Sequence, residues 1–177
     1  MYTKPLLSLL LFSLFFTSTS KAQTCNTCTV HITGNDTSSY TISTGQTLCI
    51  DSGYAFTKNI TLNGGNICIS GVFSPTSFTN NGGTLTINPN AVFIYQADLN
   101  LGALQITLSE KSVLNVLGKL TLDNTSKINN KGSINTSNNI VLNTGSTLEN
   151  NGVLNYTSLE NNGGSLTGTG SSNARQN

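Results

Sequence analysis

The sequence LTLDNTSKINNKGSIN (Leu120–Asn135) is followed 20 positions later by IVLNTGSTLENNGVLN (Ile140–Asn155). The two stretches share asparagine and glycine at matching positions, and their apolar positions stay apolar although the residue types change. A strand-and-turn unit that repeats at this length is typical of a β-solenoid, in which each unit stacks on its neighbours. The matching apolar residues are Leu120 with Ile140, Ile128 with Leu148 and Ile134 with Leu154.

Apolar pairs that lie five or six residues apart extend this pattern to six units. The steps between the first residues of successive pairs are 20, 25, 21, 14 and 20 residues. The long step predicts a loop near Phe73–Phe78, because Pro75 cannot donate a hydrogen bond from a central strand. The short step predicts a shortened rung near Val113–Lys119. The six pairs are Ile42 with Leu48, Leu62 with Ile67, Ile87 with Phe93, Leu108 with Leu114, Leu122 with Ile128, and Leu142 with Leu148.

The alternation of residues within the units indicates strands. In Ile60-Thr61-Leu62, for example, apolar residues flank a polar one, which is typical of a strand with one buried face. No stretch has a sustained helical period with capping signals. The sequence therefore predicts an all-β, single-domain parallel β-helix (β-solenoid) of about six to seven rungs with an irregular N-terminal cap. Antiparallel hairpins in a β-sandwich are the alternative, because the Asn-Gly corners are also strong hairpin signals.

The N-terminal residues have the pattern of a secretory signal peptide, which we assign to residues 1–22. Pro5–Phe16 is an apolar run that is too short to span a bilayer, and Ser20-Lys21-Ala22 is a small-x-small cleavage signal. No second run is long and apolar enough to anchor the chain, so we expect no membrane span. The expected location is secreted, extracellular or at the cell surface, and periplasmic if the outer membrane is not crossed.

The rest of the chain divides into three parts. Residues 23–40 are expected to form the irregular N-terminal cap, residues 41–166 the solenoid repeats, and residues 167–177 a flexible tail. The sequence shows no C-terminal cap. We therefore expect the last rung to present an open strand edge, through which copies of the chain could associate.

Charged residues are scarce in this sequence. Eight Lys and Arg residues stand against seven Asp and Glu residues, and together they make up 8% of the chain. Neither a basic patch for nucleic acid nor an acidic run for a cationic partner is present, so we expect no nucleic-acid partner. Polarity comes instead from Ser, Thr, Gly and 25 Asn residues. Asparagine side chains can form hydrogen-bonded ladders along a stack of strands.

An even number of cysteines in an exported chain favours disulfide bonds, and this chain has Cys25, Cys28, Cys49 and Cys68. Three pairings are possible. Cys49 and Cys68 occupy the same place in successive units, so a bridge between them is feasible, and Cys25 and Cys28 would then pair locally or join the next rung. A four-thiolate zinc site is the competing interpretation, but only Cys25 and Cys28 have the spacing of a ligand pair. We favour disulfides and expect no metal site and no cofactor.

Catalytic machinery is not evident in the sequence, and we expect a protein that is not an enzyme. His31 is the only histidine, and no serine lies in a nucleophile-elbow motif. Pectate-lyase-like enzymes use the same architecture with clustered carboxylates, whereas the seven acidic residues here are spread along the chain. Glu110 and Asp123, with three lysines nearby in the sequence, are the least scattered, and we interpret them as solvated corners.

Threonine directly precedes an apolar strand residue in five units, which predicts an outward column of hydroxyl groups. The position after that residue is a mixture of Ser, Asn and Asp. Such a face could bind polysaccharide or ice, although threonine is also a favourable outward residue in any strand. The five threonines are Thr41, Thr61, Thr86, Thr107 and Thr121.

The passages AQTCNTCTVHITGN, YTISTGQTLCI and ITLNGGNICISGVF resemble the N-terminal part of secreted surface proteins from Bacteroidetes-type bacteria. The resemblance covers most of the chain and is most specific at the four cysteines. It implies a β-solenoid with an adhesin-like role. Members of that family are often large and are exported by a type IX system through a C-terminal sorting domain. This sequence ends without such a domain, so we expect a truncated relative or a protein that stays in the periplasm.

These patterns together predict a non-catalytic structural or adhesive β-solenoid module of a secreted or cell-surface bacterial protein. Its partner would be an extracellular glycan or a surface. The first alternative is a polysaccharide- or ice-binding module that uses the outward Thr and Asn face. The second is a polysaccharide lyase-like enzyme, which has the least support in the sequence.

Overall fold

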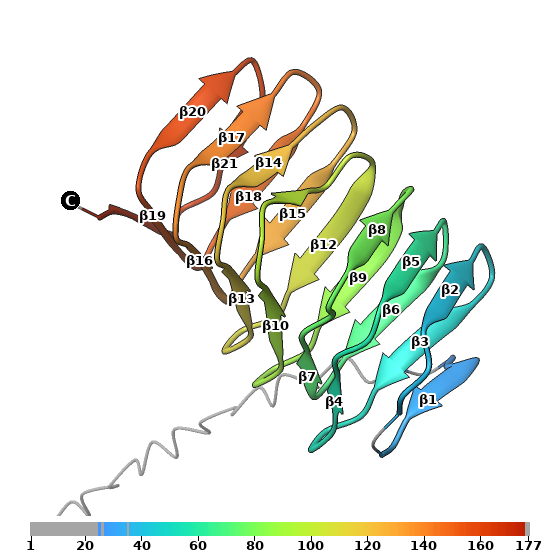
Figure 1. The fold of residues 1–177 in the computed structure, drawn as a ribbon. Helices are drawn as coiled ribbons and strands as arrows, with labels where there is room; N and C mark the ends of the chain where they lie inside the picture. Colours follow the sequence, from blue (N-terminus) through green and yellow to red (C-terminus); the bar gives the residue numbers. More distant parts are fainter. Residues whose placement is uncertain (1–24, 26, 35, 176–177) are drawn as a thin grey trace, which may run out of the picture.

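The structure of the chain, a computed structural model, describes residue 25, residues 27–34 and residues 36–175. These residues form 22 β-strands and no helix (Figure 1). Each full turn of the chain, which we call a coil, adds one strand to each of three faces, and seven coils stack in parallel. The described part of the chain is therefore an all-β parallel β-solenoid, as the sequence predicts.

Four sheets make up the three faces, because one face is split where β8 and β11 do not pair. The eight-stranded sheet contains β1 (Val30–Ile32), β3 (Thr47–Ile50), β6 (Asn66–Ile69), β9 (Gly83–Ile87), β12 (Leu104–Leu108), β15 (Lys127–Asn130), β18 (Thr147–Asn150) and β21 (Ser165–Thr167). The seven-stranded sheet contains β4 (Ala55–Phe56), β7 (Val72–Phe73), β10 (Val92–Tyr95), β13 (Val113–Val116), β16 (Ser133–Thr136), β19 (Val153–Tyr156) and β22 (Ser171–Ala174). The split face contains β2 (Tyr40–Ser43), β5 (Ile60–Asn63) and β8 (Phe78–Asn80), and then β11 (Leu99–Asn100), β14 (Leu120–Leu122), β17 (Ile140–Asn143) and β20 (Leu159–Asn162).

Alternate residues of the strands point into the stack and form apolar columns. On the eight-stranded sheet, each member of one column pairs in register with its counterpart in the next coil. Every coil thus buries its apolar side chains against those of its neighbours, which is the main source of stability for a stack of this kind. The members of this column are Ile32, Ile50, Ile69, Ile87 and Leu108, and all are fully buried.

An aromatic column fills the core behind the seven-stranded sheet. Phe56, Phe73 and Phe93 lie in successive coils and are fully buried. The ring centroids are 5.9 Å apart between Phe56 and Phe73 and 4.7 Å apart between Phe73 and Phe93. Aromatic pairs at such distances contribute to packing beyond their buried area. The rings belong to the core and leave no aromatic platform at these positions.

The repeat that first identified the fold is confirmed in register. Leu120 pairs with Ile140, and the other two matches, at 128 with 148 and at 134 with 154, also pair directly. These positions are fully buried. The parallel pairing of residues about 20 positions apart excludes the antiparallel β-sandwich for the described residues.

Of the two predicted irregularities of the repeat, the loop near Phe73–Phe78 is present, whereas the shortened rung is wrong. Paired residues are 17 to 22 positions apart throughout, with no shortened rung near Val113–Lys119. The error arose because Leu62 and Leu122 belong to the split face, whereas Ile87 and Leu108 belong to the eight-stranded sheet. Similar apolar pairs occur on successive faces. The spacing therefore matched strands of the split face to strands of the eight-stranded sheet, which made one step too long and a later step too short. The predicted loop itself is present between β7 and β8.

The expected boundaries of the solenoid need revision at both ends. The signal peptide assigned to residues 1–22 lies outside the described residues. The N-terminal cap contains a regular strand, because β1 pairs in register with β3. Residues 171–174, which we expected in a flexible tail, form β22 and pair with β19. β20, β21 and β22 are the end strands of their sheets, and self-association through this edge stays a prediction.

A pair of asparagines replaces apolar residues deep in the stack. Asn130 pairs in register with Leu108 and with Asn150, and both asparagines are buried. The Asn130 Nδ2 atom donates hydrogen bonds to Asn150 Oδ1 (2.7 Å) and to the carbonyl oxygen of Val153 (3.1 Å). Its Oδ1 atom accepts from the Gly132 N–H (3.1 Å). The side chain therefore satisfies polar groups at a corner from which water is excluded.

We expect Asn130→Ala to lower the free energy of unfolding by about 2–3 kcal/mol, because it leaves the buried Gly132 N–H without its partner. Chemical denaturation followed by circular dichroism measures the change. Asn151→Ala is the matched control, since Asn151 is exposed and its side-chain bonds, to Glu149 and from the Thr169 N–H, are both exposed to water. It should change stability by less than about 0.5 kcal/mol. Equal effects of the two substitutions would contradict a structural role for the buried pair.

Candidate functional site

The outward side chains of each face repeat once per coil. Neighbouring strands lie roughly 4.8 Å apart, so equivalent outward groups form columns with that spacing along the stack. A repeated column presents the same chemical group many times in one direction. These columns are therefore the candidate binding surface.

The five predicted threonines do not form one column, which corrects the sequence-based interpretation. Thr41 and Thr61 pair in register on the split face, and Thr79 is the third member of that column. Thr86 and Thr107 pair with each other on the eight-stranded sheet. The reason is that the spacing alone assigned strands of two different faces to one column, as it did for the apolar pairs.

Neither threonine column continues along the stack. Thr121 lies on the split face, but there it pairs with Asn100 on one side and Val141 on the other. On the eight-stranded sheet, Thr107 pairs with Asn129 in the next coil. The described faces therefore carry short threonine runs of two or three residues. The long matched columns on which the ice-binding alternative depends are not formed by these residues.

Asparagine ladders, in contrast, form as the composition predicts. On the seven-stranded sheet, the Asn173 Nδ2 atom donates to Asn155 Oδ1 (3.0 Å), and Asn155 donates to Asn135 (2.7 Å). Asn135 in turn donates to Asn115 (2.8 Å). A side-chain amide has two N–H groups and two acceptor lone pairs, and the ladder uses at most one of each. The remaining groups are available for an uncharged polar partner.

A second ladder on the split face ends on a carboxylate. The Asn162 Nδ2 atom donates to Asn143 Oδ1 (3.0 Å), and the Asn143 Nδ2 atom donates to a carboxylate oxygen of Asp123. All these bonds run in the same direction, so the final residue has only to accept. A carboxylate is an acceptor-only group and suits that position. Asp123 therefore has a structural partner in addition to solvent.

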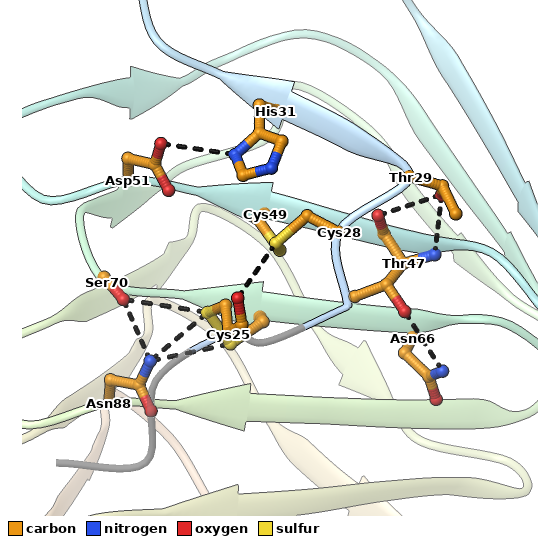
Figure 2. Close-up of a disulfide and its surroundings, with 11 residues drawn as sticks. Cys25, Cys28, Thr29, His31, Thr47, Cys49, Asp51, Asn66, Ser70 and Asn88 are labelled. Atoms are coloured by element: carbon orange, nitrogen blue, oxygen red, sulfur yellow. Dashed lines mark hydrogen bonds and ion pairs between the residues drawn. A yellow bond between two sulfur atoms is a disulfide. The ribbon is translucent and has the colours of Figure 1, made fainter.

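Two disulfides hold the described residues ahead of β1, which are Cys25 and residues 27–29, over the outer surface of the eight-stranded sheet (Figure 2). We call these residues the N-terminal segment. Cys25 is bonded to Cys68 and Cys28 is bonded to Cys49. Cys49 and Cys68 are in register, as the sequence predicts, but they do not bond to each other. Each bonds instead to a cysteine of the segment above it, and the Cα–Cα distances are 5.8 and 5.7 Å. The two cysteines of the Cys-x-x-Cys motif are thus bonded to neighbouring strands of the sheet, Cys25 to β6 and Cys28 to β3.

Polar contacts support the same segment on both sides of the disulfides (Figure 2). The Asn88 Nδ2 atom donates to Ser70 Oγ (2.9 Å) and lies 3.4 Å from the sulfur of Cys25. At the other side, the Thr47 N–H donates to Thr29 Oγ1 (2.9 Å), and the Thr29 hydroxyl donates to the Thr47 carbonyl oxygen (3.1 Å). The segment therefore covers the outer surface of β3, whose four residues are all buried.

Six of the seven acidic side chains have separate local partners, and Glu110, the seventh, lies in the turn between β12 and β13. Among the described residues, no group of three or more His, Cys, Asp or Glu side chains is arranged to hold a metal ion. His31 and Asp51 form an exposed pair at 3.3 Å. The remaining contacts are Asp36 with Tyr40, Asp98 with the Lys119 N–H, Asp123 with Asn143, Glu149 with Asn151, and Glu160 with Asn139.

One acidic group has a perturbed pKa. The Tyr40 hydroxyl and the Ser38 N–H both donate to Asp36, and these bonds lower the pKa of that carboxyl below its ordinary value. The same contact with Asp36 raises the pKa of Tyr40. The arrangement closes a turn ahead of β2, so it is a local structural contact.

Comparison with known proteins gives no match: no family model, no curated protein and no solved structure matches this chain. Over the described residues, no helix is long and apolar enough to span a membrane. The functional interpretation therefore depends on the chain's own surface.

The two residues that sequence reasoning missed are Thr79 and Tyr54. Thr79 completes the column of Thr41 and Thr61, and aligning the strands face by face would have found it. Tyr54 is 40% exposed and directly precedes β4. The sequence feature that could have identified Tyr54 is its position directly after Gly53, because an aromatic residue beside a turn glycine is often exposed.

The disulfide pairing can be tested with paired substitutions. In Cys28→Ser/Cys49→Ser, the Cys25–Cys68 bond should remain, so the denatured protein should contain no free thiol. Cys25→Ser/Cys49→Ser breaks both bonds and should leave two thiols. Thiol titration under denaturing conditions distinguishes the two variants, and two free thiols in the first variant would contradict the pairing. Loss of the Cys28–Cys49 bond should also cost about 3 kcal/mol of stability.

Proposed function

We propose that this chain is a non-catalytic structural and adhesive β-solenoid module of an exported bacterial protein. The observation that carries the proposal is the regular outer surface, on which asparagine side-chain amides of successive coils form hydrogen-bonded ladders and short runs of threonine hydroxyls lie in register. A surface of this kind suits many weak contacts with an extended partner.

The core supports a role as a rigid spacer. One apolar cluster runs from Ile32 in β1 to Leu154 in β19 without interruption. Seven coils at roughly 4.8 Å each give a stack roughly 30 Å long. In a stack of this type, each coil depends on its neighbours, so the module resists local bending more than a chain of separate turns would.

Export is supported by the covalent bonds and by the N-terminal sequence. Disulfides persist in oxidising compartments, and this chain has two among the described residues. The apolar run and cleavage signal in residues 1–22 provide a route into such a compartment. We therefore place the module outside the cytoplasm, on the cell surface or in the periplasm.

The charges favour neutral contacts over ionic ones. Among the described residues, the single contact at salt-bridge distance is the exposed one between His31 and Asp51, and exposed contacts of this kind contribute little. An adhesive surface built from amides and hydroxyls would bind extracellular glycans or similar polar surfaces and would depend weakly on salt. We do not propose lyase activity, because no three acidic side chains gather at one site among the described residues.

Adhesion by many weak contacts predicts a strong dependence on valency. The exported protein, biotinylated and presented on tetrameric streptavidin, should be retained on insoluble cellulose or chitin at least roughly 100-fold better than the monomer. Retention should be similar at low and high salt, and the supernatant should contain no released sugar.

The control is a tetramer of Asn115→Asp/Asn135→Asp/Asn155→Asp, in which like charges replace the amide ladder and should reduce retention. Failure of the wild-type tetramer to bind either solid would contradict adhesion. Retention that disappears in salt would show ionic adsorption, and release of sugar would show an enzyme.

A further inference from the structure

A groove of about 310 Å³ lies on the outside of the first three coils, where the chain passes from the eight-stranded to the seven-stranded sheet. It is separate from the threonine columns and from the asparagine ladders. Its lining residues lie in or beside the turns that join β3 to β4, β6 to β7 and β9 to β10, and these turns can be followed in Figure 1. The lining residues are Ser52, Gly53, Tyr54, Ala55, Ser70, Gly71, Val72, Pro89 and Asn90.

The groove exists because the three turns differ in length. Two residues, at 70 and 71, join β6 to β7, whereas residues 51–54 and 88–91 form longer turns on either side. The short middle turn is therefore recessed between two walls. Its floor is closely packed, since a Cβ atom on Gly71 would lie 2.2 Å from the Tyr54 carbonyl oxygen. Only glycine fits at this point, so the shape of the floor is fixed.

The walls are held by backbone conformations that suit their residues. Gly53, next to Tyr54, has φ of +86°, and Asn90 on the opposite wall has φ of +66°. Glycine and asparagine are the residues that adopt this left-handed region most readily. The two walls are thus set by local sequence and do not require a ligand to form.

The lining combines one exposed aromatic ring with uncharged polar groups. Tyr54 is 40% exposed, and it is one of three exposed large hydrophobic side chains among the described residues. Ala55, Val72 and Pro89 add apolar surface, while Ser52 and Asn90 supply a hydroxyl and an amide. None of the nine lining residues is charged.

We propose that this groove binds one pyranose ring of a neutral glycan. A pyranose has a C–H-rich face that packs on an aromatic ring and a rim of hydroxyl groups that needs both donors and acceptors. Tyr54 provides the ring, and Ser52 and Asn90 provide the donors and acceptors. The absence of charge in the lining favours a neutral sugar over a uronic acid. This inference rests on the proposed adhesive function, and it identifies a neutral glycan as the partner that binds in the groove beside Tyr54.

The test uses the exported protein labelled with ¹⁵N and titrated with cellohexaose, chitohexaose and mannohexaose. At least one oligosaccharide should shift amide signals of residues 52–55, 70–72 and 90, with a Kd in the millimolar range expected for a single shallow site. Tyr54→Ala should weaken this binding by roughly tenfold or more, whereas Tyr54→Phe, which keeps the ring, should stay within roughly threefold. Leu117→Ala is the control, because Leu117 is 50% exposed but does not line the groove.

Three results would overturn the proposal. The first is the absence of shifts in the groove with all three sugars. The second is equal binding by wild type and by Tyr54→Ala, with the control variant showing the same affinity. The third is a shift of the same signals on raising the protein concentration without sugar, which would assign the groove to a second copy of the chain.

The adhesion assay separates this inference from the proposed function. If tetramers adhere to cellulose or chitin but the groove binds none of the sugars, the groove assignment fails and adhesion stands. If an oligosaccharide binds the groove through Tyr54 but tetramers do not adhere, the groove assignment stands and the adhesive role fails.

Discussion

The structure depends on in-register parallel pairing between coils. Every inward residue packs on its counterpart in the next coil, as in the column that begins with Ile32 and reaches Leu108. A shift of one residue would turn the apolar side chains outward, so burial fixes the register. The same constraint produces the outer surface, because side chains that are in register inside are also in register outside. The ladder that includes Asn115 and Asn135 follows directly from it.

The N-terminal segment shows how this constraint can be extended with covalent bonds. Cys49 and Cys68 are adjacent in register, and a segment with Cys-x-x-Cys spacing crosses above them. The segment covers the outer surface of β3 and leads into β1, which continues the eight-stranded sheet beyond the first coil. The two disulfides therefore secure the end of the stack where a coil would otherwise lack a neighbour.

The sequence predicts the local repeat better than it predicts the faces. Alternation and spacing identified the pairing of Leu120 with Ile140, because buried apolar positions are constrained on every coil. The threonine column was wrong because similar apolar pairs occur on two faces, and nothing in the spacing alone says which face Thr86 occupies. The disulfide pairing was open for a different reason, since the path of the N-terminal segment depends on tertiary packing. The groove beside Tyr54 depends on three turn lengths together, which no single repeat displays.

The central claim is that parallel register creates the repeated polar surface, and nuclear Overhauser effects in solution test it most directly. The account predicts contacts between the side-chain amide protons of Asn115, Asn135 and Asn155 in series, together with methyl contacts that link Ile106, Ile128 and Leu148. Strong Hα–Hα contacts between neighbouring strands, which are typical of antiparallel pairing, would contradict it. In that case the ladders, the groove and the functional proposals built on them would have no structural basis.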